Sequence, residues 1–119
     1  MNSIKFNYLY RDAGNYKNYG FQVFKNPDNL PVSMIENKLA ATFFEGLLFI
    51  ANQIDLPELF HEDYPTIDDV SFHEYAGLEI IQDTGDVSGR TIKEFVERIE
   101  QESVLGWRFF DPHERSYRF

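Results

Sequence analysis

The sequence predicts an α+β fold: an antiparallel or mixed sheet with two amphipathic helices on one face, in the order β-β-α-β-β-α. Two runs near the N-terminus alternate apolar and polar residues with the period of a strand. Two later segments open with a capping-box motif and continue with apolar residues at helical spacing. Two further apolar runs have strand length. An opening hairpin followed by such a mixture is typical of helices packed on one face of a sheet.

The first two strands are predicted at residues 3–10 and 19–25. Alternate positions of the first run are apolar or aromatic, and the second run repeats the pattern with Phe21 on its apolar side. Residues 12–15 between them contain the turn formers Asp, Gly and Asn, and Gly14 can adopt a positive φ without steric cost. We therefore expect a β-hairpin.

A helix is predicted at residues 33–44, because a serine and a glutamate at its start have capping-box spacing and apolar residues recur every four positions. Residues 47–51 have the composition of a buried strand. Residues 55–65 predict a short turn or a single helical turn, and residues 65–71 an acidic loop.

The second half of the chain repeats this alternation of strand and helix. Residues 72–82 predict another strand, in which Gly77 marks a bulge. Residues 83–90 read as a loop, and a second capping box starts a helix at 91–102. A short last strand is expected at 107–110. Six side chains from the helices and strands are expected in the core: Phe21, Ile35, Leu39, Phe49, Phe95 and Ile99.

Length and composition indicate one ordered domain, residues 1–119. The chain has 119 residues, the size of a single core, and its 43% hydrophobic content argues against disorder. It contains no Cys, which excludes disulfides and thiolate metal sites, and nothing indicates a cofactor. Neither a signal-peptide pattern nor an 18-residue apolar run is present, so we expect a cytoplasmic protein that does not enter the membrane.

The net charge of −9 is concentrated in the middle of the chain. Residues 39–89 contain eleven acids and no Lys or Arg, whereas residues 1–38 are slightly basic and 90–119 are neutral. Such a field repels nucleic acid and attracts a basic protein surface, although acidic loops also serve solubility alone. The acidic residues expected to face a protein partner are Glu58, Glu62, Asp63, Asp68 and Asp69.

The predicted hairpin combines aromatic, basic and turn-forming residues. Tyr and Arg dominate binding hot spots, and exposed turn N–H groups beside basic side chains suit a phosphate or carboxylate. The alternative is structural, with Asp and Asn bonding the turn and the tyrosines covering the sheet. The candidate partner- or ligand-binding residues here are Tyr8, Arg11, Asp12, Asn15, Tyr16, Lys17 and Tyr19.

The stretch "YLYRDAGNYKNYG" (8–20), with the later segments "LPELF", "FHEY" and "IKEFVERI", resembles a family of small, uncharacterised bacterial proteins. The resemblance covers most of residues 6–100 and is closest over 8–20. That family has no established activity or catalytic motif. The resemblance therefore implies a single domain and assigns no functional residue.

Three His–carboxylate groups are the remaining chemical candidates. They centre on His61, His73 and His113, and a metal site or general acid–base pair needs such groups to converge in space. The sequence has no HExxH, Walker, nucleophile-elbow or dinucleotide motif. A weak glycine loop at 84–89 precedes a helix start, but its own Asp86 opposes anion binding. We predict no catalytic and no metal-binding residue.

Three functions remain after these observations. The leading interpretation is a non-catalytic acidic protein-binding module that covers a basic surface of a partner, the profile of small inhibitors and of bacterial or phage immunity and anti-defence proteins. The alternative is a small-ligand-binding protein whose Tyr/Arg/Lys hairpin holds an anionic metabolite or nucleotide. The third is a metal-dependent hydrolase built on His61, His73 and nearby acids. The sequence does not indicate an oligomeric state.

Overall fold

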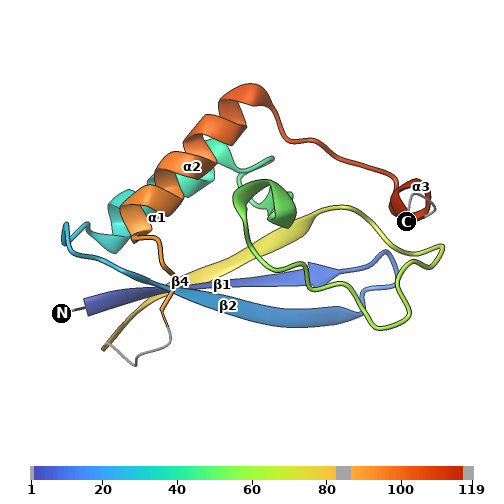
Figure 1. Cartoon of the computed structure of the whole chain (residues 1–119), viewed down its shortest axis with the longest axis horizontal. Coiled ribbons are helices and arrows are strands. Elements are labelled where there is room, and N and C mark those ends of the chain that lie inside the picture. The colour runs from blue at the N-terminus through green and yellow to red at the C-terminus, as the bar shows by residue number, and fades with distance from the viewer. Residues whose placement is uncertain (1, 83–86, 117–119) are drawn as a thin grey trace.

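A computed structural model of the chain describes residues 2–82 and 87–116 (Figure 1). The elements in chain order are β1 (Asn2–Arg11), β2 (Lys17–Lys25), α1 (Val32–Thr42), β3 (Leu48–Phe49), the 3₁₀ helix η1 (Ala51–Ile54), β4 (His73–Gln82), α2 (Ile92–Leu105) and α3 (Pro112–Ser116). The strands form one antiparallel sheet in the order β2-β1-β4-β3, and α1 and α2 lie on one face of it. The predicted α+β class is confirmed.

The N-terminal hairpin is confirmed over its whole length. β1 and β2 pair without interruption from Ser3 opposite Lys25 to Arg11 opposite Lys17. On its other side β1 pairs with β4, and the register shifts between Phe6 and Tyr8. Ala76 and Gly77 of β4 there oppose the single residue Asn7 of β1, so the bulge expected at Gly77 is present, and this glycine adopts φ 112°.

The two predicted helices differ in how they begin. In α2 the capping box forms as expected, because Thr91 Oγ1 accepts from Glu94 N (3.1 Å) and Glu94 Oε1 accepts from Thr91 N (2.9 Å). In α1 the expected capping box of Ser33 and Glu36 is wrong. That helix starts earlier, with the extended residue Pro31 as its N-cap and no side-chain cap. The Pro31 carbonyl oxygen accepts from Met34 N (3.1 Å) and Ile35 N (3.2 Å), and these bonds begin the helix before Ser33.

Two shorter segments also differ from the sequence expectations. The strand expected at 47–51 shrinks to β3, and the helical turn expected within 55–65 occurs earlier, as η1. The strand expected at 107–110 is absent from the described residues, and α3 follows instead. His113 N donates to Asp111 Oδ1 (2.9 Å), a helix-start bond that the Asp-Pro sequence at 111–112 encodes. Of the loop at 83–90, residues 83–86 lie outside the described residues, and so does part of the glycine loop at 84–89.

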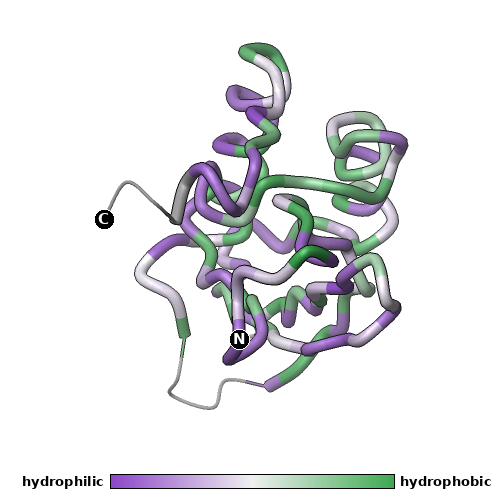
Figure 2. The backbone as a smooth tube through the Cα atoms, turned by 90° about the vertical axis from the view of Figure 1, so that its right-hand side faces the viewer, coloured by the Kyte–Doolittle hydropathy of each residue, from purple (hydrophilic) through white to green (hydrophobic). Residues whose placement is uncertain are grey.

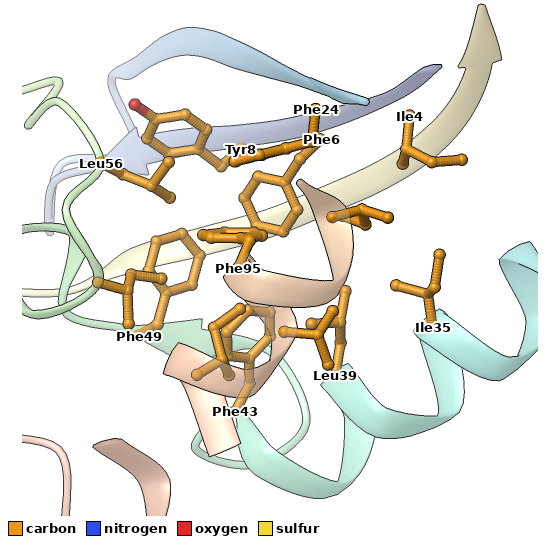
Figure 3. Close-up of a cluster of buried hydrophobic side chains, with 14 of the residues drawn as sticks. Ile4, Phe6, Tyr8, Phe24, Ile35, Leu39, Phe43, Phe49, Leu56 and Phe95 are labelled. Atoms are coloured by element: carbon orange, nitrogen blue, oxygen red, sulfur yellow. The ribbon is translucent and has the colours of Figure 1, made fainter. Parts of the chain in front are cut away.

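The core fills the space between the sheet and the two main helices (Figure 3). Phe24 of β2 and Phe95 of α2 stack with ring centroids 4.3 Å apart, and Phe6 of β1 meets Phe95 edge to face at 5.1 Å. Five of the six residues expected in the core are buried: Ile35, Leu39, Phe49, Phe95 and Ile99.

The sixth expectation, burial of Phe21, is wrong: this side chain is 59% exposed. Phe24 is the cross-strand neighbour of buried Ile4 and faces the helices, whereas Phe21 is opposite Asn7. Successive side chains of a strand alternate between faces, so Phe21 lies on the outer face of the sheet. Alternation in the sequence separates the two faces of a strand but does not say which one the helices cover.

Hydrophobic residues are dispersed along the chain. Figure 2 shows short hydrophobic and hydrophilic stretches alternating along much of the backbone. Across residues 2–82 and 87–116, none of the helices is both long enough and apolar enough to span a bilayer.

Candidate functional site

The turn between β1 and β2 is held by Asp12. Tyr16 N donates to Asp12 Oδ1 (2.9 Å), Asp12 N donates to Tyr16 O (3.1 Å), and Asn15 N donates to Asp12 O (2.9 Å). The residue with a positive φ is Asn15, at 68°, and the expectation that Gly14 would take this role is wrong. Asn tolerates the left-handed region because its side chain bonds locally. Asp12 and Asn15, both predicted site residues, thus shape the turn.

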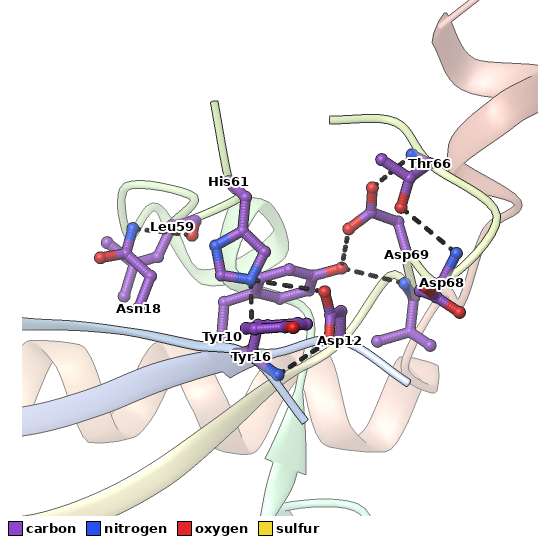
Figure 4. A network of polar contacts seen from close by, with 10 residues as sticks. Tyr10, Asp12, Tyr16, Asn18, Leu59, His61, Thr66, Asp68 and Asp69 are labelled. Atoms are coloured by element: carbon purple, nitrogen blue, oxygen red, sulfur yellow. Dashed lines mark hydrogen bonds and ion pairs between the residues drawn. The ribbon is translucent and has the colours of Figure 1, made fainter. Parts of the chain in front are cut away.

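Residues 56–72, here called the strap, run from η1 along the hairpin to β4 (Figures 1 and 4). The first half of the strap is bonded to β2 and to the turn. Asn18 Nδ2 donates to Leu59 O (3.0 Å), and His61 Nε2 lies 3.1 Å from Tyr16 O. These contacts join segments more than 40 positions apart in the sequence.

The second half of the strap is bonded to β1 and the turn. Ala13 N donates to Asp68 O (2.8 Å) at the turn itself. The Tyr10 hydroxyl donates to Asp69 Oδ1 (2.5 Å) and accepts from Val70 N (3.0 Å). Figure 4 shows the Tyr10 ring lying between the two halves of the strap. The strap is therefore fastened to the hairpin at both ends.

Close packing against β2 adds to these hydrogen bonds. Gly20 lies under Leu59, and a Cβ at position 20 would be 2.9 Å from both Leu59 methyl carbons. A larger residue at position 20 therefore requires the Leu59 side chain to shift. Tyr8 is buried in the core, and its hydroxyl donates to Pro57 O (2.6 Å). Tyr8, a predicted site residue, therefore supports the strap from inside the protein.

His73 lies beneath the strap as a buried neutral base. Its ring is 5.2 Å from Tyr10 and 5.3 Å from Phe60 between centroids, and its Nε2 accepts from Leu59 N (2.9 Å). Burial lowers the pKa of His73 to about 4. Burial, and then the hydrogen bond to Asp69, raises the pKa of Tyr10. Both groups are therefore uncharged near neutral pH and serve packing.

The hairpin turn and the strap carry a group of exposed residues, called here the tip surface: Tyr16, Glu62, Asp63, Ile67 and Asp68. Tyr16 is 72% exposed and Ile67 is 91% exposed, and the three acids are exposed as well. The bonds of His61 to Tyr16 and of Asp68 to Ala13 bring the strap against the turn. Two groups of candidate residues that are far apart in the sequence thus meet at one end of the protein.

The basic and aromatic residues of the hairpin are divided between this end and the outer face of the sheet. Arg11 Nε donates to Glu74 Oε2 (2.7 Å) and Arg11 Nη1 donates to Asn15 Oδ1 (2.5 Å). Lys17 is exposed, and Tyr19 is 67% exposed on the outer face. The Arg11 guanidinium is thus engaged within the chain.

The five predicted acids do not have the same environment. Glu62, Asp63 and Asp68 are exposed, and Glu58 is half-buried. Asp69 is also half-buried, and its second carboxylate oxygen accepts from a backbone N–H within the strap at 2.6 Å. Only Glu62, Asp63 and Asp68 of the five are therefore exposed.

The three histidines each bond a backbone group of the strap or the turn. His113 Nε2 lies 2.7 Å from Thr66 O, while His61 and His73 bond Tyr16 and Leu59 as described. Within the described ranges, no three His, Asp or Glu side chains are grouped to hold a metal ion. The hydrolase interpretation receives no geometric support from these residues.

A cavity of about 340 Å³ lies apart from the tip surface, beside the first turns of α2. Its two arginines already donate to backbone oxygens, Arg90 to Asp55 O (3.1 Å) and Arg98 to Gln53 O (3.2 Å). Three acids also line it, so it is poorly suited to an anion. The lining residues are Asp55, Arg90, Glu94, Glu97, Arg98 and Gln101.

Ile67 and the pair Phe60 and Tyr64 contribute to the site but are not among the candidate residues named from the sequence. Ile67 lies in an acidic loop with no periodicity, so only the structure reveals that it is exposed beside the turn. Phe60 and Tyr64 stack with centroids 4.0 Å apart and stiffen the strap. Their i, i+4 spacing in a proline-flanked aromatic segment is a signal that could have indicated this packing.

Fold and site together define a small α+β protein whose hairpin carries a braced acidic and aromatic end. No family model, curated protein or solved structure matches the chain. The resemblance of residues 8–20 to a family of small bacterial proteins stays a prediction.

Proposed function

We propose that this chain is a non-catalytic acidic protein-binding module whose tip surface covers a basic surface of a partner protein. The observation that carries the proposal is the exposure of Tyr16 and Ile67 beside Glu62, Asp63 and Asp68 on a loop that hydrogen bonds fasten to a hairpin. Isolated apolar residues are common on protein surfaces. Two exposed apolar side chains on a fastened loop, next to several negative charges, suit recognition of a partner.

The bracing favours binding because it reduces the entropy lost on association. The strap has bonds to the hairpin at Leu59, His61, Asp68, Asp69 and Val70. A loop already held in one conformation loses less freedom when a partner covers it than a mobile loop does. The structure thus supplies a preorganised surface.

The charges favour a basic partner. Residues 39–89 have eleven acids and no Lys or Arg, and Glu62, Asp63 and Asp68 of this segment are exposed at the tip surface. A negative patch speeds encounter with a positive one and raises the cost of binding an acidic partner. Tyr16 and Ile67 would then provide the apolar centre, within a rim of acids. An inhibitor or immunity-type role is the biological form we propose for such an activity.

Binding of a small anionic ligand through the hairpin is the competing proposal. It requires Arg11 and Lys17 to point into one concavity, since small-ligand sites are concave. The bonds of Arg11 to Glu74 and Asn15 reduce its availability to an anion. Protein binding is therefore the better-supported of the two.

Affinity capture from a lysate of the native host tests the proposal. The double variant Tyr16→Ala/Ile67→Ser removes the apolar centre without touching the core, and we expect it to lose a partner that the unmodified protein retains. The matched control is Val104→Ser/Leu105→Ser, which removes two exposed apolar side chains from the end of α2. Equal retention by both double variants would contradict the assignment of the tip surface.

A further inference from the structure

β2 is an edge strand, and the described chain covers only one end of it. Ser88 N donates to Val23 O (2.7 Å), and Lys25 forms a bridge with Thr91. Val23 and Lys25 therefore point their backbone groups away from β1. Because backbone groups alternate in direction along a strand, those of every second residue of β2 point the same way.

The remaining outward-pointing residues of β2 are Lys17, Tyr19 and Phe21. Their backbone groups make no hydrogen bond with residues 2–82 or 87–116 in the structure. The side chains of Tyr19 and Phe21 are 67% and 59% exposed. Unpaired edge strands with exposed aromatic residues are templates for pairing with another chain.

We propose that β2 pairs with β2 of a second copy of this chain, antiparallel and about a two-fold axis at Tyr19. The length of the open edge determines this register. Pairing ends at the turn before Lys17 and at Val23, whose carbonyl oxygen is occupied. Only a register centred on Tyr19 uses all three open residues, and it places Lys17 opposite Phe21 of the second copy.

The side chains on the outer face suit this register. The Phe21 ring already makes a cation–π contact within its own chain, because Lys5 Nζ lies 4.3 Å from the ring centroid. In the dimer, Lys17 of the second copy is the direct cross-strand neighbour of Phe21, and the two Tyr19 rings face each other. The two copies of Lys17 are then about 13 Å apart, four residues along the strand. Solvent screens their repulsion over about 8 Å at physiological salt.

Sedimentation equilibrium of the full chain tests the proposal. We expect reversible dimerisation between ~10 μM and ~1 mM, as befits a small interface. Phe21→Lys places two lysines opposite each other at both ends of the pairing and should weaken the dimer about tenfold. The exchange Lys17→Phe/Phe21→Lys should restore it. Val104→Lys, the matched control on exposed α2, should not change it. A protein that stays monomeric at ~1 mM, or an undiminished Phe21→Lys dimer, would overturn the proposal.

Cysteine cross-linking then tests the register, because the chain has no Cys of its own. A hydrogen-bonded antiparallel pair places Cα atoms about 5.5 Å apart, within the range of a disulfide. Tyr19→Cys should therefore cross-link to itself under mild oxidation. Lys17→Cys and Phe21→Cys should cross-link when mixed but not separately. Efficient cross-linking of Lys17→Cys alone would contradict the register. The dimer does not depend on the acids of the tip surface, so it can fail without affecting the proposed function.

Discussion

Acidification should destabilise the protein through His73. In the folded protein burial lowers the pKa of His73 to about 4, whereas the unfolded chain has the ordinary value of 6.5. Between these two values the unfolded chain binds a proton that the folded protein does not bind. The stability from this group is therefore fully present above pH 6.5 and is lost as the pH falls to about 4. The pKa difference corresponds to about 3 kcal/mol.

The surroundings of His73 explain why the folded protein disfavours its protonated form. The ring lies among Tyr8, Tyr10, Phe49 and Phe60, where a charge would be poorly solvated. Nε2 accepts from Leu59 N, and a protonated Nε2 cannot accept this bond. Nδ1 has no hydrogen-bond partner among the described residues that would stabilise a cation.

Urea unfolding of the wild type and of His73→Gln, from pH 7 to pH 4, checks this prediction. The variant loses packing and is less stable at pH 7, but its residue 73 does not titrate. The stability difference between the two proteins should therefore shrink by about 3 kcal/mol on going to pH 4. Groups other than His73 titrate in both proteins and cancel in the comparison. A difference that stays constant over this range would refute the reasoning.

Three further predictions concern stability, each read from the urea midpoint at pH 7. Tyr10→Phe should cost about 1–3 kcal/mol, because it leaves Asp69 and Val70 without the Tyr10 hydroxyl, whereas the exposed control Tyr19→Phe should cost almost nothing. Thr91→Ala should cost about 1 kcal/mol and Ser33→Ala much less, since only Thr91 caps its helix; equal losses would contradict the cap assignment. Gly20→Val should cost about 1–3 kcal/mol by displacing the Leu59 side chain, and an unchanged midpoint would show that this side chain moves aside freely.

Sequence patterns predicted a helix start or a bulge correctly where a single nearby residue determines that feature. The capping box depends only on Thr91 and Glu94, which are three positions apart in the sequence. The bulge depends on a positive φ, which the glycine at position 77 indicates directly. The same motif at Ser33 failed because Pro31, two residues earlier, starts the helix first. The competing start signal was present in the sequence as well.

The candidate site was harder to predict because it depends on contacts across the chain. Asp68 and Asp69 are neighbours with identical side chains, yet Asp69 is bound to Tyr10 and Asp68 is exposed. Phe21 and Phe24 lie in one strand, and only the position of the helices decides which is buried. Composition indicated an acidic segment and an aromatic hairpin. Their meeting at one end of the protein follows from pairings over about 50 positions, which no local pattern encodes.

The rate of association with a captured partner tests the central claim most directly. Asp63→Lys/Asp68→Lys reverses two exposed acids of the tip surface, and Asp28→Lys/Glu97→Lys makes the same change in net charge elsewhere on the exposed surface. We expect the first variant to associate at least about tenfold more slowly at ~10 mM salt, with a smaller effect at ~150 mM, because the Debye length falls from about 30 to about 8 Å. The control should associate almost as fast as the wild type. The claim that the tip surface meets a basic partner would be contradicted if both variants associated equally slowly. It would also be contradicted if Asp63→Lys/Asp68→Lys associated as fast as the wild type.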